Sequence, residues 1–220
     1  MPKPQERDLE ETKITFTRWL ESKLTDVNNL NVELLGGPEN TGFSNETLSF
    51  NVAYELGDKQ IKTGMVLRFY PEGFFVFPDY DIHKQYLIMQ KLANHEIKVP
   101  NVLWYEPSEK VFGTSFYVME MANGDAPSDN PPFHQEGWVA DSSEEVRQNI
   151  WWGWVEQMAK IHQVDISTGD FEFLNRPKLS EDYLEQELNY YFMYFVFFCL
   201  TIFLIYCVWK FFFPKKIRVF

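Results

Sequence analysis

The sequence predicts an α+β fold, an antiparallel five-stranded sheet with one helix inserted after its third strand and further helices beyond the sheet. Apolar residues alternate with polar ones over 47–54, and a second alternating run over 61–69 follows a Gly-Asp turn, which is the pattern of a hairpin. Two more strand-like runs, 102–106 and 116–121, come after a stretch with helical spacing. The order is therefore strand, strand, strand, helix, strand, strand.

The elements before the hairpin, and the two faces of the hairpin, follow from the same periodicities. Residues 8–24 carry apolar side chains at helical spacing and predict an amphipathic first helix, and 31–35 predict a short strand. Because successive side chains of a strand point to opposite faces, Val66 and Arg68 are expected on one face of the sheet, opposite Leu67.

Helices account for the expected structure around and after the last two strands. Asp79 or Asp81 is expected to cap the helix inserted into the sheet. A run rich in proline and aspartate over 125–141 predicts an ordered linker, and Ser142 with Glu145 forms a capping box that opens a long helix. The apolar stripe of that helix comprises Val146, Ile150, Trp154, Met158 and Ile161, widened by Trp151, Val155 and His162. A face so rich in tryptophan predicts a sizeable partner surface.

The carboxyl end changes character abruptly. A helix expected over 181–191 begins amphipathic and runs into 190–209, which has no charged residue. Such a helix would be about 30 Å long, the thickness of a bilayer's hydrocarbon core. We therefore expect a membrane-spanning, hydrophobic helix over 190–213 and a basic tail over 214–220, so that the membrane is an expected partner.

Two sequence features predict opposite orientations of that span in the membrane. The basic carboxyl end favours a cytoplasmic tail, whereas a carboxy-terminal anchor without a secretory signal leaves the large amino-terminal domain in the cytosol. We favour a single-pass carboxy-terminal anchor with a cytosolic amino-terminal domain, because charge bias is a weak guide after a long folded domain. If the apolar tail is a product of truncation, the expected location is cytoplasmic.

Charge and cysteine content exclude several classes of protein. Residues 1–189 carry a net charge of −16 and the last 31 residues +4. An acidic surface repels nucleic-acid phosphates, so no nucleic-acid partner is expected, although a local nucleotide site is compatible with it. The chain has 2 cysteines, Cys199 and Cys207, both within the apolar tail, and neither a disulfide framework nor a cysteine metal site is expected.

The stretch 36–70 carries the clearest functional signal. A polar, glycine-rich segment precedes one strand, and the next strand ends on Arg68. A loop of small residues over a strand, with a cation on its neighbour, is a way to hold nucleotide phosphates. An ordinary antiparallel hairpin with a surface arginine has the same local pattern, so further motifs have to decide between the two.

Five motifs extend this signal along the chain, and together they resemble the aminoglycoside phosphotransferase and choline kinase-like family. They are GFSNET, VLRFYP, FYVMEMANG, APSDNPPFHQEGW and AKIHQVD, and the resemblance covers about residues 8–191. The nearer likeness is to the phosphotransferase domains fused to acyl-CoA dehydrogenases. The resemblance implies ATP as the nucleotide, phosphorylation of small hydroxylated molecules, and a protein-kinase-like amino-terminal lobe followed by an incomplete helical second lobe.

The resemblance also implies a domain organisation. It predicts an amino-terminal helix within 1–28, a nucleotide-binding lobe over 29–123, and a linker with the first helices of the second lobe over 124–189. No protein partner follows from the motifs.

Site residues are implied position by position. Gly42, Ser44, Asn45 and Thr47 correspond to the loop over the ATP phosphates. Arg68 takes the place of the phosphate-pairing basic residue, and its fixed charge and planar fork suit that role.

The base and the supporting positions are implied in the same way. Val66 would line the adenine site, and the backbone of Glu120, Met121 and Ala122 would form the hinge that pairs with the adenine edge. Gln85 stands where the family has a glutamate that pairs with the basic residue, and it could accept a hydrogen bond from Arg68 without pairing its charge. His162 matches a histidine of the first helix of the family's second lobe, where packing or a backbone hydrogen bond is favoured over a catalytic role.

One departure limits the expected activity. The family's His-Gly-Asp run, followed five residues later by Asn, does not occur between His162 and Phe220, nor does its magnesium-binding Asp motif. Phosphoryl transfer needs a positioned nucleophile and metal ions that neutralise charge. We therefore expect no catalytic residue and no metal ligand in this chain, and a truncated, inactive family product. The alternative is a membrane-anchored pseudokinase or nucleotide-binding interaction module, and a working enzyme would require the missing half from another chain.

Overall fold

The computed structural model describes residues 7–37, 46–71, 80–128, 131–174 and 178–212. The chain divides into two compact units, Met1–Leu174 and Asn175–Phe220, which are taken separately below.

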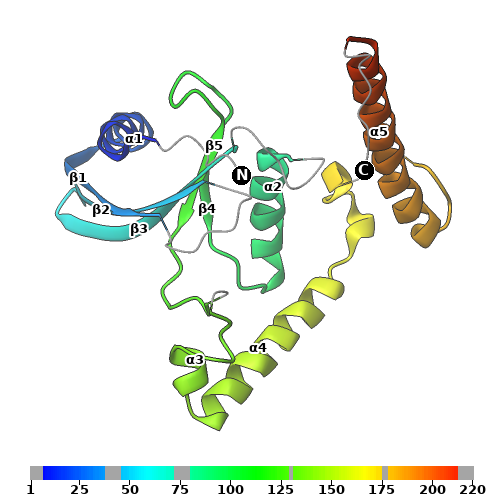
Figure 1. The fold of residues 1–220 in the computed structure, drawn as a ribbon. Helices are drawn as coiled ribbons and strands as arrows, with labels where there is room; N and C mark the ends of the chain where they lie inside the picture. The colour runs from blue at the N-terminus through cyan, green and yellow to red at the C-terminus, as the bar shows by residue number, and fades with distance from the viewer. Residues whose placement is uncertain (1–6, 38–45, 72–79, 129–130, 175–177, 213–220) are drawn as a thin grey trace. The chain divides into compact units, whose positions relative to one another are not determined.

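A single antiparallel sheet forms the centre of the first unit (Figure 1). Its strands are β1 (Val27–Gly36), β2 (Thr47–Leu56), β3 (Lys59–Phe69), β4 (Val102–Glu106) and β5 (Phe116–Glu120). Their order in the sheet is β1-β2-β3-β5-β4, so the inserted helix lies in sequence between β3 and the outer strand β4. The predicted α+β fold with a five-stranded antiparallel sheet is confirmed.

The sheet differs from the prediction in the length of β1. The strand begins at Val27, four residues before the predicted start, because a register shift between Asn28 and Asn31 lets the pairing with β2 continue across an irregularity. Asn29 adopts a φ of 53° there, a left-handed conformation that asparagine tolerates better than most residues. An apolar periodicity cannot report such a bulge, since its extra residue breaks the alternation.

The helix α1 (Leu9–Lys23) covers one face of the sheet. Asp8 caps its amino terminus by accepting hydrogen bonds from the N–H groups of Glu10 and Glu11. Phe16 is completely buried, and its ring centroid lies 4.5 Å from that of Phe50 on β2. The core side chains from the sheet comprise Val32, Leu48, Phe50, Val52, Met65, Leu67, Phe69, Phe116 and Val118. The predicted alternation of β2 and β3 is confirmed, since every second residue enters this core.

The helix α2 (Ile82–Leu92), followed by the 3-10 turn η1 (Ala93–His95), packs against β4 and β5. Asp81 is its N-cap, accepting from the N–H of Lys84, and so decides between the two predicted caps. The ring of Tyr86 lies 6.2 Å from that of Tyr117 on β5 and 5.7 Å from that of Tyr105 on β4.

Beyond β5 the first unit is helical. It contains α3 (Trp138–Asp141), α4 (Glu144–His162) and the 3-10 turns η2 (Ile166–Thr168) and η3 (Glu172–Leu174). Ser143, rather than the predicted Ser142, caps α4 by accepting from the N–H of Val146. Ser142 instead terminates α3, because its N–H and its hydroxyl bond to carbonyl oxygens of that short helix.

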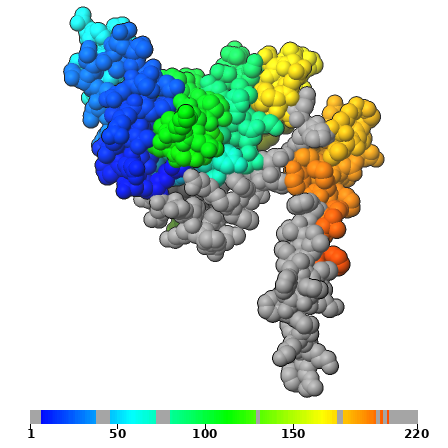
Figure 2. Space-filling model, turned by 90° about the horizontal axis from the view of Figure 1, so that it is seen from above, coloured from blue at the N-terminus to red at the C-terminus, as the bar shows by residue number. Residues whose placement is uncertain are grey.

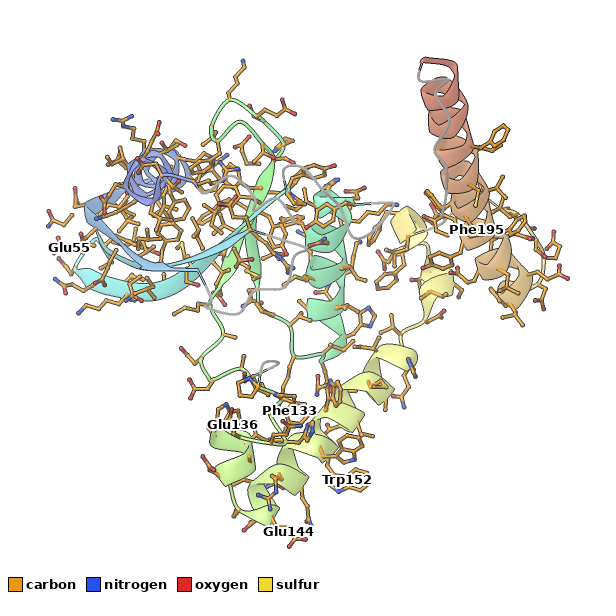
Figure 3. All side chains as sticks on the ribbon, viewed as in Figure 1. Glu55, Phe133, Glu136, Glu144, Trp152 and Phe195 are labelled. Carbon is orange, nitrogen blue, oxygen red and sulfur yellow. The ribbon has the colours of Figure 1, made fainter. Side chains whose placement is uncertain are left out.

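The apolar face of α4 is uncovered in the described residues. Trp151, Trp152 and Trp154 are 58%, 65% and 63% exposed, and Trp152 projects from the helix in Figure 3. Trp151 and Trp154 belong to the predicted apolar stripe, their ring centroids are 6.1 Å apart, and these two tryptophans are called the α4 face below. His162 is also exposed, so the implied packing role is not observed here.

The second unit contains α5 (Tyr183–Phe212), a continuous helix that passes through the predicted boundary at residue 190. The Asp182 carboxylate accepts a hydrogen bond from the N–H of Glu185 at the start of the helix. In the part of the chain that the structure describes, no helix combines the length and apolar character needed to cross a membrane. The predicted membrane-spanning helix over 190–213 is therefore not confirmed.

Candidate nucleotide-binding face

The face of the sheet opposite α1 brings together three of the predicted site residues. Directly opposed residues of antiparallel strands point to the same side. Thr47 on β2 pairs with Arg68 on β3, and Arg68 pairs with Tyr117 on β5. The second row, two residues along, runs from Ser49 through Val66 to Met119. These two rows are called the Arg68 face.

Arg68 lies at the centre of the first row and is half-buried. Its Nη1 donates a hydrogen bond to the hydroxyl oxygen of Tyr117 at 3.4 Å. The Tyr117 side chain is completely buried, and its hydroxyl lies 3.9 Å from the Sδ of Met89 on α2. Burial raises the pKa of the Tyr117 phenol above its ordinary value, although the charge of Arg68 opposes that shift. Tyr117 is therefore a neutral partner of the guanidinium at physiological pH.

Gln85 belongs to the same cluster, and its side chain is hydrogen-bonded to the phenol of Tyr80. Burial raises the pKa of Tyr80, whereas the bond to Gln85 and the positive charge of Arg68 act to lower it. The Tyr80 ring lies 5.3 Å from that of Tyr70 in an edge-to-face arrangement. A direct bond from Arg68 to Gln85 stays a prediction, while the bond of Gln85 to Tyr80 places the amide in the neighbourhood of Arg68.

The predicted hinge, Glu120 to Ala122, is joined to β3 and to the segment before β4. The N–H of Met121 donates to the carbonyl oxygen of Gly64 at 2.9 Å, and the N–H of Glu120 donates to that of Asn101 at 2.8 Å. The amide of Asn101 returns a 2.8 Å bond to the Glu120 carboxylate. Since these two N–H groups already have partners, an adenine edge would meet the backbone at Ala122 or at carbonyl oxygens.

The predicted phosphate loop can be located only by its two ends. Gly42, Ser44 and Asn45 lie outside the described residues. The carbonyl oxygen of Glu46 accepts from the N–H of Phe69 at 3.1 Å, next to Arg68 in sequence. Since β1 ends at Gly36 and β2 begins opposite Arg68, the segment joining them enters β2 at the Arg68 end of β3.

Arg7 fixes the same corner from the α1 side of the sheet. Its Nε lies 2.6 Å from a carboxylate oxygen of Glu46, its Nη1 donates to the carbonyl oxygen of Phe112 at 3.0 Å, and its guanidinium lies 4.3 Å from the centre of the Phe69 ring. A hollow of about 230 Å³ lies here, between the start of α1 and the β4–β5 connection. Figure 2 shows these two segments, in blue and bright green, beside one another. This hollow is on the side of α1 and does not belong to the Arg68 face.

No metal site accompanies the face within the described ranges. There, no three side chains of His, Cys, Asp or Glu come together as a group that could hold a metal ion. No step below depends on a bound metal ion.

Sequence reasoning missed Tyr80 and Tyr117, the two phenols beside Arg68. Tyr117 reads as one member of an apolar strand, because the sequence does not give the register that pairs it with Arg68. For Tyr117, the tyrosine in FYVMEM was a usable signal, since a buried phenol usually has a hydrogen-bond partner.

The chain is similar in sequence or in structure to known proteins. Acyl-CoA dehydrogenase family member 10 of Mus musculus is 25% identical over 134 residues, which are 61% of this chain and 11% of the mouse protein. The crystal structure of a candidate aminoglycoside phosphotransferase from Ralstonia eutropha is 20% identical and aligns with a TM-score of 0.49, over 76% of this chain and 42% of the bacterial one. The chain thus spans a minor part of the length of both relatives. The family model of the phosphotransferase enzyme family (APH) matches residues 46–191, well over half of the chain, and the chain belongs to that family.

Proposed function

We propose that this chain supplies the nucleotide-binding lobe of an ATP-dependent phosphotransferase that acts on small hydroxylated molecules. The observation that carries the proposal is the row of Thr47, Arg68 and Tyr117, which sets a guanidinium opposite Thr47, the last residue of the predicted phosphate loop. Family membership adds the reaction class, since phosphotransferases of this family typically use ATP.

The phosphates are assigned to the first row of the Arg68 face. A guanidinium presents N–H donors in a rigid fork that matches two phosphate oxygens, and it stays charged at every physiological pH. The Thr47 hydroxyl is on the strand position opposite Arg68 and can donate to the same group. Together they favour an anion at the place where the segment before β2 enters the sheet.

The adenine is assigned to the second row, toward the hinge. Val66 and Met119 are cross-strand neighbours, and Met119 is two residues from Met121. Two residues of strand separate the rows by about 7 Å, a span that a ribose can bridge between base and phosphates. Val66 then contacts the base, and the backbone at Ala122 meets its polar edge.

The proposal assigns no chemical step to these 220 residues. The His-Gly-Asp run is absent from the sequence, so the base that orients the acceptor hydroxyl and the ligands of the metal would come from residues outside this chain. The chain alone is expected to bind nucleotide and to transfer no phosphoryl group.

A second candidate is a nucleotide-binding interaction module that performs no chemistry in any context. The observation that favours it is the exposed α4 face, because exposed clusters of large aromatic side chains mark interaction sites. The two candidates differ in what happens when the rest of a family member's second lobe is added, since only the first regains ATP-dependent transfer.

Calorimetric titration of the purified chain with ATP tests the proposal. We expect Arg68→Ala to weaken ATP binding by roughly tenfold to a hundredfold, the range for a hydrogen bond to a charged group. The matched control is Arg18→Ala, which removes an exposed arginine from α1 on the opposite face and should leave the affinity unchanged. An affinity insensitive to Arg68→Ala, or ATP turnover by the chain alone, would contradict the proposal.

A further inference from the structure

We propose that Tyr117 is the positioning residue for Arg68, and that its buried phenol holds the guanidinium in the orientation that receives a phosphate. This inference rests on the proposed function and deepens it. It assigns to a tyrosine on β5 the task that the family resemblance gives to a carboxylate on the helix after β3, where this chain has Gln85.

The geometry makes Tyr117 a fixed point. Its side chain is completely buried, and the Tyr86 ring packs edge-on against it at 6.2 Å. Its hydroxyl, close to the Sδ of Met89, accepts from Nη1 of Arg68 at 3.4 Å. Because α2 packs against the Tyr117 ring, the phenol cannot move with the Arg68 side chain. The guanidinium is therefore oriented by the phenol.

The surrounding contacts extend this support to α2. Tyr80 lies close enough to Arg68 and Tyr117 for both to influence its ionisation, and Gln85 is hydrogen-bonded to its phenol. Gln85 thus acts on Arg68 indirectly, by orienting Tyr80. In the family that this chain resembles, the helix after β3 carries a glutamate that pairs with the basic residue. Here the corresponding helix, α2, still supports Arg68, but through neutral groups.

A neutral acceptor has a consequence that a carboxylate does not. A carboxylate bonded to the guanidinium would compete with an incoming phosphate and offset part of the guanidinium's positive charge. A phenol accepts one hydrogen bond and leaves that positive charge unchanged. Orientation of Arg68 is obtained here without electrostatic competition from the orienting group.

The test compares ligands with and without phosphates. Tyr117→Phe keeps the buried ring and removes the hydroxyl. We expect it to weaken ATP binding roughly threefold to tenfold, the range for a typical intramolecular hydrogen bond, and to leave adenosine binding unchanged. In a double-mutant cycle, Tyr117→Phe should add no further loss to Arg68→Ala, because the two residues act as one unit.

Tyr105→Phe is the matched control. Tyr105 is a β4 phenol of the same aromatic cluster, with its ring 4.4 Å from that of His83 and its hydroxyl bonded to Ser115. It should bind ATP as the wild type does.

A second measurement tests, without nucleotide, whether Tyr117 restricts the motion of the Arg68 guanidinium. It also distinguishes this effect from a loss of folding. The Nε–H signal of Arg68 in a ¹⁵N NMR spectrum, assigned by its loss in Arg68→Ala, should show restricted motion in the wild type and larger motion in Tyr117→Phe.

Three outcomes would overturn the inference: unchanged ATP affinity in Tyr117→Phe, equal losses for ATP and adenosine, or unchanged Arg68 motion. Failure of the wild type to bind ATP would instead overturn the proposed function.

Discussion

The carbonyl oxygen of Gly64 accepts a 2.9 Å hydrogen bond from the N–H of Met121, and the Met121 side chain lies over the glycine. A Cβ at position 64 would come within 2.4 Å of Met121 Cε and 2.8 Å of Met121 Cβ. This contact joins the predicted hinge to the middle of β3, so the hinge has a fixed position relative to Val66 and Arg68.

Gly64→Ala is expected to lower the free energy of unfolding by about 1–3 kcal/mol, because the new methyl group overpacks against Met121. Urea denaturation measures the change. The control is Gly153→Ala, a helical position on α4 where an added Cβ meets nothing within 4 Å. That variant should gain about 0.5–1 kcal/mol from helix propensity. Equal stability of Gly64→Ala and the wild type would mean that Met121 moves aside freely.

Val66→Phe is expected to weaken adenosine and ATP binding alike, by roughly tenfold or more, because a bulkier side chain fills the space assigned to the base. This pattern differs from that of Arg68→Ala, which should affect only the phosphorylated ligand. Ile61→Phe is the control and should leave both affinities unchanged. Ile61 is on the same strand but pairs with Tyr54 near the hairpin turn. Selective loss of ATP binding in Val66→Phe would move the base to another part of the face.

The pH dependence of stability should reveal the bond between Trp19 and Glu106. The indole N–H of Trp19 donates to Glu106 at 3.0 Å, and this bond, with Lys23 at 3.1 Å, holds the pKa of the carboxyl below its ordinary value. Since the folded-state pKa is the lower one, ionised Glu106 contributes stability above its unfolded-state pKa, and that contribution is lost as the pH falls through the folded-state pKa.

We therefore expect Glu106→Gln to reduce the decline of stability below about pH 4.5, as followed by urea denaturation at several pH values. Glu109→Gln is the control, since Glu109 is an exposed carboxylate of the neighbouring turn. Parallel pH curves for Glu106→Gln and the wild type would show that ionisation of Glu106 contributes nothing to folding.

Two tryptophans separate the packed from the unpacked part of the first unit. Trp19→Ala should cost about 3–5 kcal/mol, because Trp19 is 6% exposed in the core, whereas Trp154→Ala should change stability by less than about 0.5 kcal/mol at 63% exposure. Thermal unfolding, with the oligomeric state checked by light scattering, measures both. A large loss for Trp154→Ala would show that the α4 face is covered in solution.

Much of the fold could be predicted because its signals are local. The hairpin, the bounds of β4 and the cap at Asp81 each depend on a few consecutive residues. The face of Arg68 was predictable for the same reason, since strand alternation decides it. The neighbours of Arg68 were not, because Tyr117 meets it only through the register between β3 and β5, 49 residues apart in sequence.

The shift of the α4 cap has a different physical origin. Ser142 and Ser143 can both cap a helix, and the choice depends on α3, a four-residue helix whose carboxyl end takes Ser142. The capping motif alone does not show that α3 and α4 compete for Ser142. The role of Gln85 is a similar case, because its bond to Tyr80 depends on how α2 docks against the sheet.

The strand order has a consequence for how the chain folds during synthesis. α1 and the meander β1–β2–β3 lie within the first 69 residues and are joined by short connections. Phe16, Leu20, Phe50 and Leu67 therefore leave the ribosome early and can condense before β4 and β5 exist. Phe116 and Val118 then complete a core that has already begun to form. Tyr117 lies between them on the same strand, so the Arg68 face is expected to form last.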